Sequence, residues 1–325
     1  MRTIAFFNNE GGVGKTSLVY HLAWMLVELG HRVMAADLDP HSGLTEMFLD
    51  EERLEELWEG SSATTIYRAV EPLWLEGDVK AATLERVHER LALLPGDIGL
   101  SACEDVLADG WGRCRQRDSR GYEIVSSLAR VLMRSAVEHA ADYVLVDMGP
   151  NLGAINHAAL LGADHIVIPI VADLPSIAGL ESLGTALRRW RQEWRSLLDA
   201  RPAGLDLQPA ERELAVLGYV TQLYAARKGI RSMRDHQRWV RRIPSVYGEF
   251  VLGLHEGPSY SVEEDPQCLG VIKSYQSLMS IALGAGKPMF HLTPADGAMG
   301  SHARAVRDAY RDFEQLARAV TRLAT

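Results

Sequence analysis

The feature that most constrains this chain is a glycine-rich segment near the N-terminus, set between an apolar run and an amphipathic stretch. Residues 3–7 are apolar and strand-like, residues 8–14 are polar and rich in glycine, and residues 15–29 repeat apolar side chains at helical spacing. A second apolar run, 33–36, follows after Gly30, which ends the predicted helix. A unit of strand, helix and strand requires a parallel sheet with helices on its faces.

Further apolar runs alternate with helical stretches along the rest of the chain. They lie at residues 91–94, 143–147, 165–170 and 215–220. This alternation favours a single α/β domain over residues 1–325, with a doubly wound, mostly parallel sheet and helices on both faces. An acidic segment at 46–59 is expected to be helical. A C-terminal helix is expected at 301–323, where mixed charges favour packing against the domain over binding to a membrane.

The segment 10–17 reads EGGVGKTS and lies where a phosphate-binding loop belongs, between the first strand and the first helix. Glycines let backbone N–H groups converge on phosphate oxygens, and the helix N-terminus adds the positive end of its dipole. Lys15 would reach the β- and γ-phosphates, and the Thr16 hydroxyl would bind Mg²⁺. The strict pattern fails only at its first position, where Asn9 replaces glycine. The expected cofactor-binding residues are Gly11, Gly12, Val13, Gly14, Lys15, Thr16 and Ser17.

The glycine-rich loop is followed by two further motifs in the order that a known family has them. On these three motifs the chain resembles the ParA/MinD family of deviant Walker ATPases, and more closely its ParA branch. The family's loop reads KGGVGKT, which residues 10–16 match at every position but the first. Residues 37–41, DLDPH, resemble the family's switch I motif DxDPQ, with His41 in place of glutamine. Residues 147–153, DMGPNLG, resemble its Walker B and switch II segment, usually D-x-P-P-S-L-G. The match is weaker over about 46–120.

The resemblance implies roles for individual residues and ATP with Mg²⁺ as cofactors. Lys15 would stabilise the transferred charge, Thr16 would ligate Mg²⁺ directly, and Asp147 would hold it through water. Asp39 would orient the attacking water. Asp37 would support the metal shell, although an acidic residue at a strand end can also simply cap a loop. Phosphoryl transfer needs little beyond such positioning and charge stabilisation. The implied catalytic residues are Lys15, Asp39, Asp147 and Glu10, and the implied metal residues are Thr16, Asp37 and Asp147.

Glu10 is the main departure from the family, whose lysine at this position crosses the dimer interface to the partner's nucleotide. Two unit charges about 4 Å apart interact by about 4 kcal/mol at an effective dielectric constant near 20. One interpretation is that the reversed charge weakens the ATP sandwich dimer or slows turnover. A second is that Glu10 turns to solvent and another cation replaces the lysine. A third is that the residue was engineered to trap one state, and the sequence does not choose among them.

A basic segment at 227–242 contrasts with the net charge of −9 of the whole chain. Five of its arginines are spaced 4, 3, 4 and 3 residues apart, which would place them on one face of a helix. Such a stripe suits phosphate contacts that hold DNA without reading its sequence. A solvated arginine face or a site for a partner protein is the alternative. The expected DNA-binding residues are Arg227, Lys228, Arg231, Arg234, Arg238, Arg241 and Arg242.

Other features narrow the functional class. Cys103, Cys114 and Cys268 are isolated, which argues against a disulfide framework and is most simply compatible with a reducing cytoplasm. Their positions also do not fit a nitrogenase-iron-protein-like reductase, which needs two cluster cysteines per subunit flanking the switch segment. An amidoligase would need a substrate motif, and none is visible. His21, His41 and His157 show no metal-ligand spacing.

The sequence therefore predicts a cytoplasmic, nucleoid-associated ParA-like ATPase. It would form a homodimer on binding ATP, bind DNA nonspecifically, and partition or position a plasmid, a chromosome or another cargo. A ParB-like centromere-binding or cargo adaptor protein would be its partner, and no membrane would be involved. The alternative is a nucleotide-gated binding module whose hydrolysis is impaired by Glu10.

Overall fold

A single mixed sheet forms the centre of the computed structural model, which describes residues 1–60, 64–74, 77–223 and 233–324, with the backbone alone at 223 and 233–236. Within these residues the sheet has eight strands in the order β3-β4-β2-β5-β1-β6-β7-β8. Their bounds are β1 Arg2–Phe6, β2 Val33–Leu38, β3 Glu85–His88, β4 Leu91–Leu94, β5 Tyr143–Met148, β6 His165–Val171, β7 Ala215–Leu223 and β8 Cys268–Lys273. Neighbouring strands are parallel except β3 and β4.

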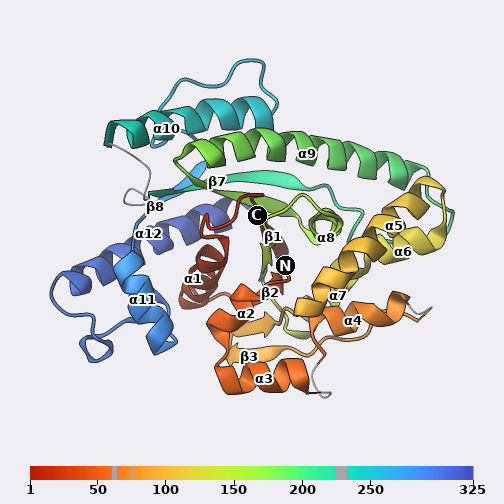
Figure 1. The fold of residues 1–325 in the computed structure, drawn as a ribbon, viewed down its shortest axis with the longest axis horizontal. Coiled ribbons are helices and arrows are strands. Elements are labelled where there is room, and N and C mark those ends of the chain that lie inside the picture. The colour runs from red at the N-terminus through yellow and green to blue at the C-terminus, as the bar shows by residue number, and fades with distance from the viewer. Residues whose placement is uncertain (61–63, 75–76, 224–232, 325) are drawn as a thin grey trace.

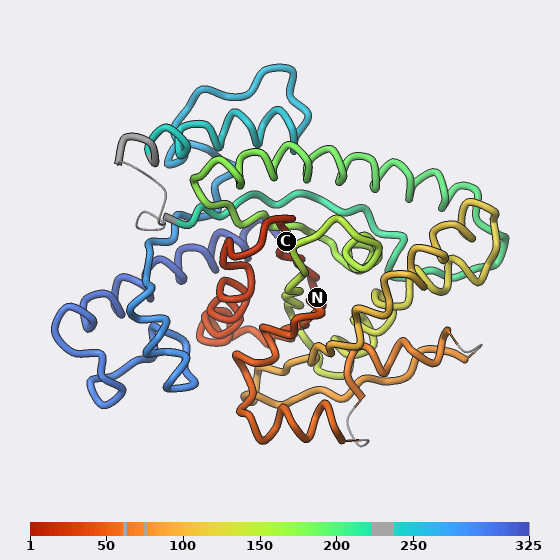
Figure 2. Tube along the Cα trace, in the orientation of Figure 1, coloured from red at the N-terminus to blue at the C-terminus, as the bar shows by residue number. Residues whose placement is uncertain are grey.

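Helices cover both faces of this sheet (Figure 1), so the predicted doubly wound α/β fold is confirmed. Their bounds are α1 Lys15–Glu28, α2 Gly43–Phe48, α3 Glu51–Glu59, α4 Ile66–Trp74, α5 Cys103–Arg115, α6 Ser119–Val125, α7 Ser127–Glu138, α8 Ala154–Ala159, α9 Leu174–Asp199, α10 Met233–Val246, α11 Gln276–Ala285 and α12 Ser301–Leu323. The long helix α9 lies beside α10 in the chain trace (Figure 2).

Alternating side chains of the central strands supply the two halves of the core. Ile4 and Phe6 of β1 pack into a cluster with α1, α11 and α12. Ala5, between them, faces the opposite cluster, which α4, α5 and α7 to α9 complete. Because successive side chains of a strand point to opposite faces, one apolar run can support both helical layers. This explains why the central strands read as continuous apolar segments.

Two strands at the edges of the sheet were not predicted. β3 reads ERVH and alternates between half-buried and exposed residues, and β8 reads CLGVIK and is only partly buried. Neither has the continuous apolar run by which the central strands are recognised, because an edge strand has a neighbour on one side only. The apolar run at 215–220 is the last clear one in the sequence, and β8 follows it in the structure.

The helical predictions hold with one correction. The acidic segment 46–59 contains the end of α2 and the whole of α3. Asp50 lies between the two helices and caps α3, because its side chain accepts a hydrogen bond from the backbone N–H of Arg53 at 2.9 Å. α12 packs against the domain as expected, with Phe313, Leu316 and Val320 fully buried or nearly so. Across the described residues, none of the helices combines the length and the apolar character that crossing a bilayer requires.

Candidate functional site

The glycine-rich loop leaves β1 at the centre of the sheet and enters α1. Gly12 and Gly14 have φ values of 72° and 79°, a left-handed conformation that favours glycine. Asn8 anchors the loop, because its side-chain Nδ2 donates to the carbonyl oxygen of Pro169 at 2.7 Å and its Oδ1 accepts from the N–H of Glu10 at 3.0 Å. The loop and the first turn of α1 line a cavity of about 600 Å³. Its geometry is that of an anion site at a helix N-terminus.

Lys15, the first residue of α1, directs its ammonium group back to the loop. Its Nζ donates to the carbonyl oxygen of Glu10 at 2.9 Å. Burial lowers the pKa of Lys15, and the nearby carboxylates of Asp147 and Asp39 oppose this shift. A buried cation among backbone N–H groups fits a polyphosphate, as the sequence predicts.

Asp147 lies at the end of β5, beside the first turn of α1. It is fully buried, and neither carboxylate oxygen has a hydrogen-bond partner within the described part of the chain. Burial raises its pKa well above the usual range and the charge of Asp37 adds to this, whereas the nearby Thr16 hydroxyl and the charge of Lys15 oppose it. Carboxylate oxygens are the ligands that Mg²⁺ prefers. The residues present therefore fit a magnesium ion, held by Thr16 and, directly or through water, by Asp147.

Asp37 lies directly across from Asp147 in the register of β2 and β5. Its carboxylate accepts hydrogen bonds from the backbone N–H of Thr45 at 2.8 Å, from the Thr45 hydroxyl at 2.7 Å and from the N–H of Asp39 at 3.2 Å. Thr45 Oγ1 accepts in turn from the N–H of Gly96 at 2.8 Å. Burial raises the pKa of Asp37 to about 6. These contacts correspond to the loop-capping alternative, and the metal-shell role of Asp37 stays a prediction.

Asp39 reaches the cavity from the loop after β2. His41, which replaces the family's glutamine, places its ring Nδ1 at 2.9 Å from Asp39 Oδ1 and donates its backbone N–H to the same oxygen at 3.0 Å. A methyl group built on Gly149 would lie 3.4 Å from Asp39 Oδ1, so Asp39 faces the segment 149–153. Asp39 and this segment thus meet at the edge of the cavity.

Two residues hold the segment 149–153, and of these only Glu104 was not indicated by the sequence. Asn156 of α8 donates from its side-chain nitrogen to the carbonyl oxygens of Gly149 and Asn151, each at 2.8 Å. Glu104 of α5 caps α8, and its carboxylate accepts from the N–H groups of Ala154 and of Ile155, the latter at 3.2 Å. Only a contact between distant segments identifies Glu104, and no local pattern could have found it.

Glu10 does not extend into solvent. Its carboxylate accepts a hydrogen bond from the hydroxyl of Ser176 in the first turn of α9, and the side chain is half-buried. The second interpretation of Glu10, a side chain turned to solvent, is therefore not the conformation observed. The reversed charge stays beside the phosphate loop.

The far side of the cavity is formed by the ends of β7 and β8. Gln222 packs so closely on Gly14 that any side chain there would collide with it, and its Nε2 lies 3.2 Å from the Gly14 carbonyl oxygen. Lys273, Ser274 and Tyr275 follow at the end of β8. Ligands of open α/β sheets bind outside the carboxyl ends of the strands. Gln222 was not among the predicted site residues.

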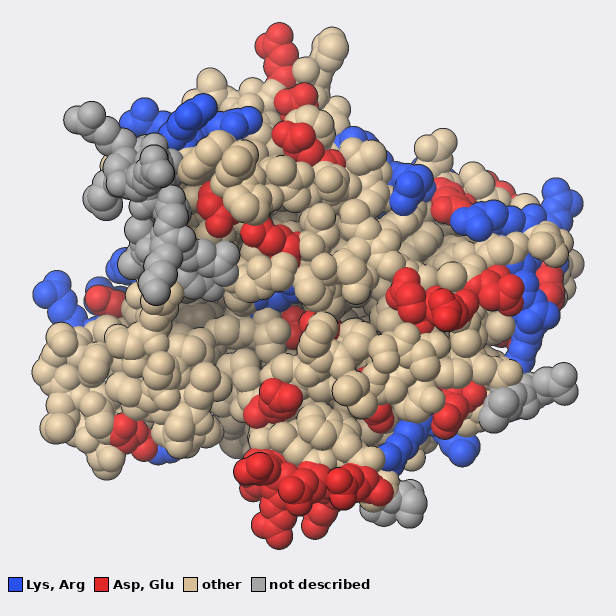
Figure 3. Space-filling model, viewed as in Figure 1, with Lys and Arg blue, Asp and Glu red and all other residues tan. Residues whose placement is uncertain are grey.

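The predicted basic stripe is only partly described. Arg227, Lys228 and Arg231 lie outside the described residues, and Arg234 is described by its backbone alone. Arg238, Arg241 and Arg242 lie exposed on α10, and the guanidinium carbons of Arg238 and Arg242 each lie 5.3 Å from the Trp239 ring. Figure 3 shows blue side chains gathered over this helix, whereas an acidic patch covers α3.

A doubly wound sheet with a glycine loop, a buried lysine and an unpartnered carboxylate defines a P-loop nucleotide-hydrolysing protein. The AAA_31 family, described as an AAA domain, matches residues 1–200. The chain belongs to the ParA/MinD family of P-loop ATPases, as its motifs suggest, and ATP and Mg²⁺ are the cofactors of that family.

One curated relative and two solved structures show what this chain is similar to in sequence and in fold. Protein IncC of Escherichia coli is 31% identical over 59% of this chain, and the match spans 47% of IncC, less than half its length. Protein DIP2308 of Corynebacterium diphtheriae has a similar fold, with a TM-score of 0.71, 24% identity and coverage of 100% of this chain and 99% of that one. A plasmid partition protein of Borrelia burgdorferi also shares the fold, with a TM-score of 0.57, 15% identity and coverage of 99% and 98%.

Proposed function

We propose that this protein is a partition or positioning ATPase that binds Mg-ATP in the P-loop cavity, dimerises in that state and holds DNA nonspecifically. The observation that carries the proposal is the meeting of buried Lys15 with the unpartnered carboxylate of Asp147 at the mouth of a glycine loop. The name of the Borrelia partition protein supports the same kind of role. The cargo would be a plasmid, a chromosome or another large particle, presented by a ParB-like adaptor protein.

The residues of the cavity divide the work of phosphoryl transfer. Lys15 would stabilise charge on the transferred group, and Asp39, facing the segment 149–153, would orient the attacking water. Thr16 and Asp147 would hold Mg²⁺, which would neutralise phosphate charge. The proposed catalytic roles are supported by Lys15 and Asp39, which line the cavity, and by the charge of Asp147 beside Lys15. Glu10 contributes its carbonyl oxygen as the resting partner of Lys15.

The DNA site would include the exposed arginines of α10. Arg238, Arg241 and Arg242 supply positive charge in a segment whose sequence, 227–242, contains one acidic residue, and Trp239 keeps two guanidinium groups close together. Bound to nucleoid DNA, the protein would use phosphate contacts that carry no sequence information.

The test is binding of nonspecific duplex DNA at physiological salt with Mg-ATP, with Mg-ADP and without nucleotide. The proposal expects binding with Mg-ATP alone, and equal binding in all three conditions would contradict it.

Replacing Arg238, Arg241 and Arg242 by glutamate should weaken DNA binding at least about tenfold. It should also reduce the slope of log affinity against log salt concentration by about three, because each lost phosphate contact removes about one released ion. The matched control replaces three other exposed arginines by glutamate, namely Arg304, Arg307 and Arg311 of α12. An equal loss in both triple variants would show a general charge effect.

A nucleotide-gated module with impaired hydrolysis is the second candidate, favoured by the Glu10 carboxylate fixed at Ser176. Replacing Glu10 by lysine should increase the Mg-ATP-dependent dimer at least about tenfold, since it removes a repulsion beside the triphosphate and restores the family's cation. Sedimentation at several protein concentrations measures this. Glu10→Gln, which removes the charge alone, should give an intermediate value. If all three proteins dimerise equally, Glu10 does not control assembly.

A further inference from the structure

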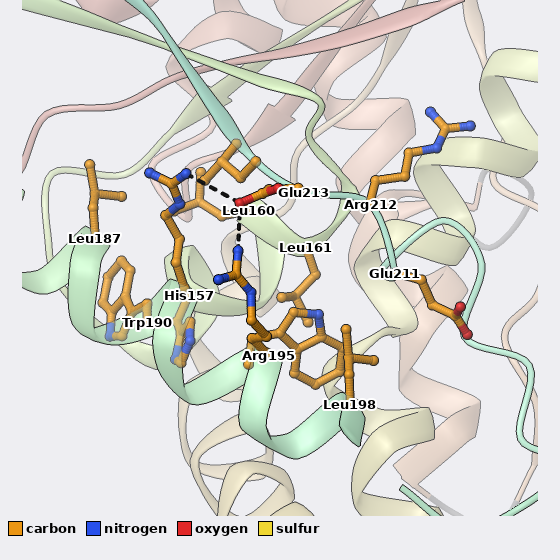
Figure 4. Close-up of a pocket in the computed structure, with 13 residues that line it drawn as sticks. His157, Leu160, Leu161, Leu187, Trp190, Arg195, Leu198, Glu211, Arg212 and Glu213 are labelled. Carbon is orange, nitrogen blue, oxygen red and sulfur yellow. Dashed lines mark hydrogen bonds and ion pairs between the residues drawn. The ribbon is translucent and has the colours of Figure 1, made fainter. Parts of the chain in front are cut away.

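A second cavity, of about 260 Å³, lies between α8, α9 and the segment that precedes β7 (Figure 4). It shares none of its lining residues with the P-loop cavity. Leu160 and Leu161 reach it from the end of α8, and Trp190 and Trp194 reach it from α9. No function described above uses this space.

The floor of the cavity is flat and uncharged. The His157 ring is stacked between two indoles, with a centroid distance of 3.7 Å to Trp111 and 4.6 Å to Trp190 and interplanar angles of 5° and 11°. Burial, followed by the charges of Arg115 and Arg189, lowers the pKa of His157 to about 3. The ring is therefore neutral at physiological pH. Both faces of the ring are covered, so the ring and the leucines offer edge and apolar contacts to the face of a planar group.

The rim of the cavity carries an excess of positive charge. Arg195 pairs with Glu213 at 2.6 Å, whereas Arg191 approaches the same oxygen only to 3.8 Å. Figure 4 shows Arg195 and Glu213 meeting above the apolar walls. Two arginines thus share one carboxylate, and within the described residues Arg191 makes no hydrogen bond. Arg212 is engaged elsewhere, with Asp164 at 2.9 Å. Arg191 therefore has donors to offer to an incoming anion.

We propose that this cavity binds a small bicyclic aromatic carboxylic acid, with its rings against Trp190 and the leucines and its carboxylate on Arg191. The size supports this class, because an apolar cavity of about 150 Å³ accepts benzene. Drug-sized ligands occupy pockets of about 300 Å³ or more. The charge supports it too, because Arg191, a cation with spare donors, borders a space with leucine and tryptophan walls. This site is independent of the proposed ATPase function.

The test is calorimetric titration of the full chain with 2-naphthoate and with its neutral analogue, 2-naphthamide. The wild type should bind one naphthoate per chain saturably and the amide at least about tenfold more weakly, since a hydrogen bond between charged groups is lost. Arg191→Gln should weaken naphthoate binding by a similar factor. Leu187→Trp, which fills the cavity, should abolish it.

Arg189→Gln is the matched control, because Arg189 lies on the same helix, is exposed and does not line the cavity. It should bind naphthoate like the wild type. Absence of saturable binding by the wild type would overturn the proposal, as would equal affinities for the acid and the amide or full binding by Arg191→Gln. Arg191→Gln changes a partly exposed side chain, so the test does not depend on whether Leu187→Trp folds.

Discussion

Replacing Lys15 by alanine should abolish ATP binding at physiological nucleotide concentrations. The loop has one cation that reaches into the cavity, and its Nζ is already directed there by the Glu10 carbonyl oxygen. Losing two charge-assisted hydrogen bonds to phosphate, at roughly 1.5–3 kcal/mol each, corresponds to an affinity loss of roughly 100-fold or more. Titration with a fluorescent ATP analogue in Mg²⁺ measures the effect, and steady-state hydrolysis should fall with it.

The matched control for this variant is Lys80→Ala, which removes one positive charge from an exposed position outside the cavity. It should bind ATP like the wild type. Thermal unfolding of both variants without nucleotide shows whether each is folded. Unchanged ATP affinity in a folded Lys15→Ala variant would exclude residues 10–17 as the phosphate-binding loop.

Acidification from pH 7 to pH 5 should destabilise the wild type relative to a His157→Phe variant by about 2 kcal/mol. The pKa of His157 is lowered to about 3 in the folded protein, whereas an unfolded histidine titrates near 6.5. Between these two pKa values the unfolded state binds a proton that the native state does not bind. The contribution of His157 to the free energy of unfolding is therefore fully present above pH 6.5 and is lost as the pH falls toward 3. Phenylalanine keeps a ring between Trp111 and Trp190 but binds no proton.

The comparison of two proteins is essential to this measurement. Asp37 and Asp147 have raised pKa values and favour the native state as the pH falls, in the opposite direction to the histidine. Their contribution is common to both proteins and cancels in the difference between the two free energies of unfolding. Urea titrations at pH 7, 6 and 5 give that difference. A difference that does not change with pH would mean that His157 binds its proton as readily in the native state as in the unfolded state.

The centre of the fold was predictable from the sequence because its strands are buried on both faces. β1, β2, β4, β5 and β6 read as apolar runs, and the predicted positions agree with the structure to within one or two residues. The edge strands β3 and β8 could not be recognised, because β3 has no fully buried residue and β8 has only two, so neither reads as a continuous apolar run. A sequence pattern reveals a strand through its buried apolar side chains, and an edge strand has too few of them to be recognised.

The candidate site divides in the same way. Lys15, Asp39 and Asp147 follow from motifs in which neighbouring residues define the chemistry. Lys15 and Asp39 line one cavity, and the charge of Asp147 lies close to Lys15. Glu104 and Gln222 act on the loops of the site from distant segments, and only the three-dimensional structure brings them there. Asp37 shows a third case, in which the motif is present but the carboxylate is occupied by Thr45.

The attachment of α8 has a mechanical consequence. Glu104 holds its first N–H groups, and two residues further on the indoles of Trp111 and Trp190 grip His157 from both sides. These contacts hold α8 against α5 and α9. The segment 149–153 is therefore attached at both ends, to β5 on one side and to α8 on the other. Any displacement of this segment during a nucleotide cycle has to come from rotations within its own five residues, so the distance that it can move is limited by its length.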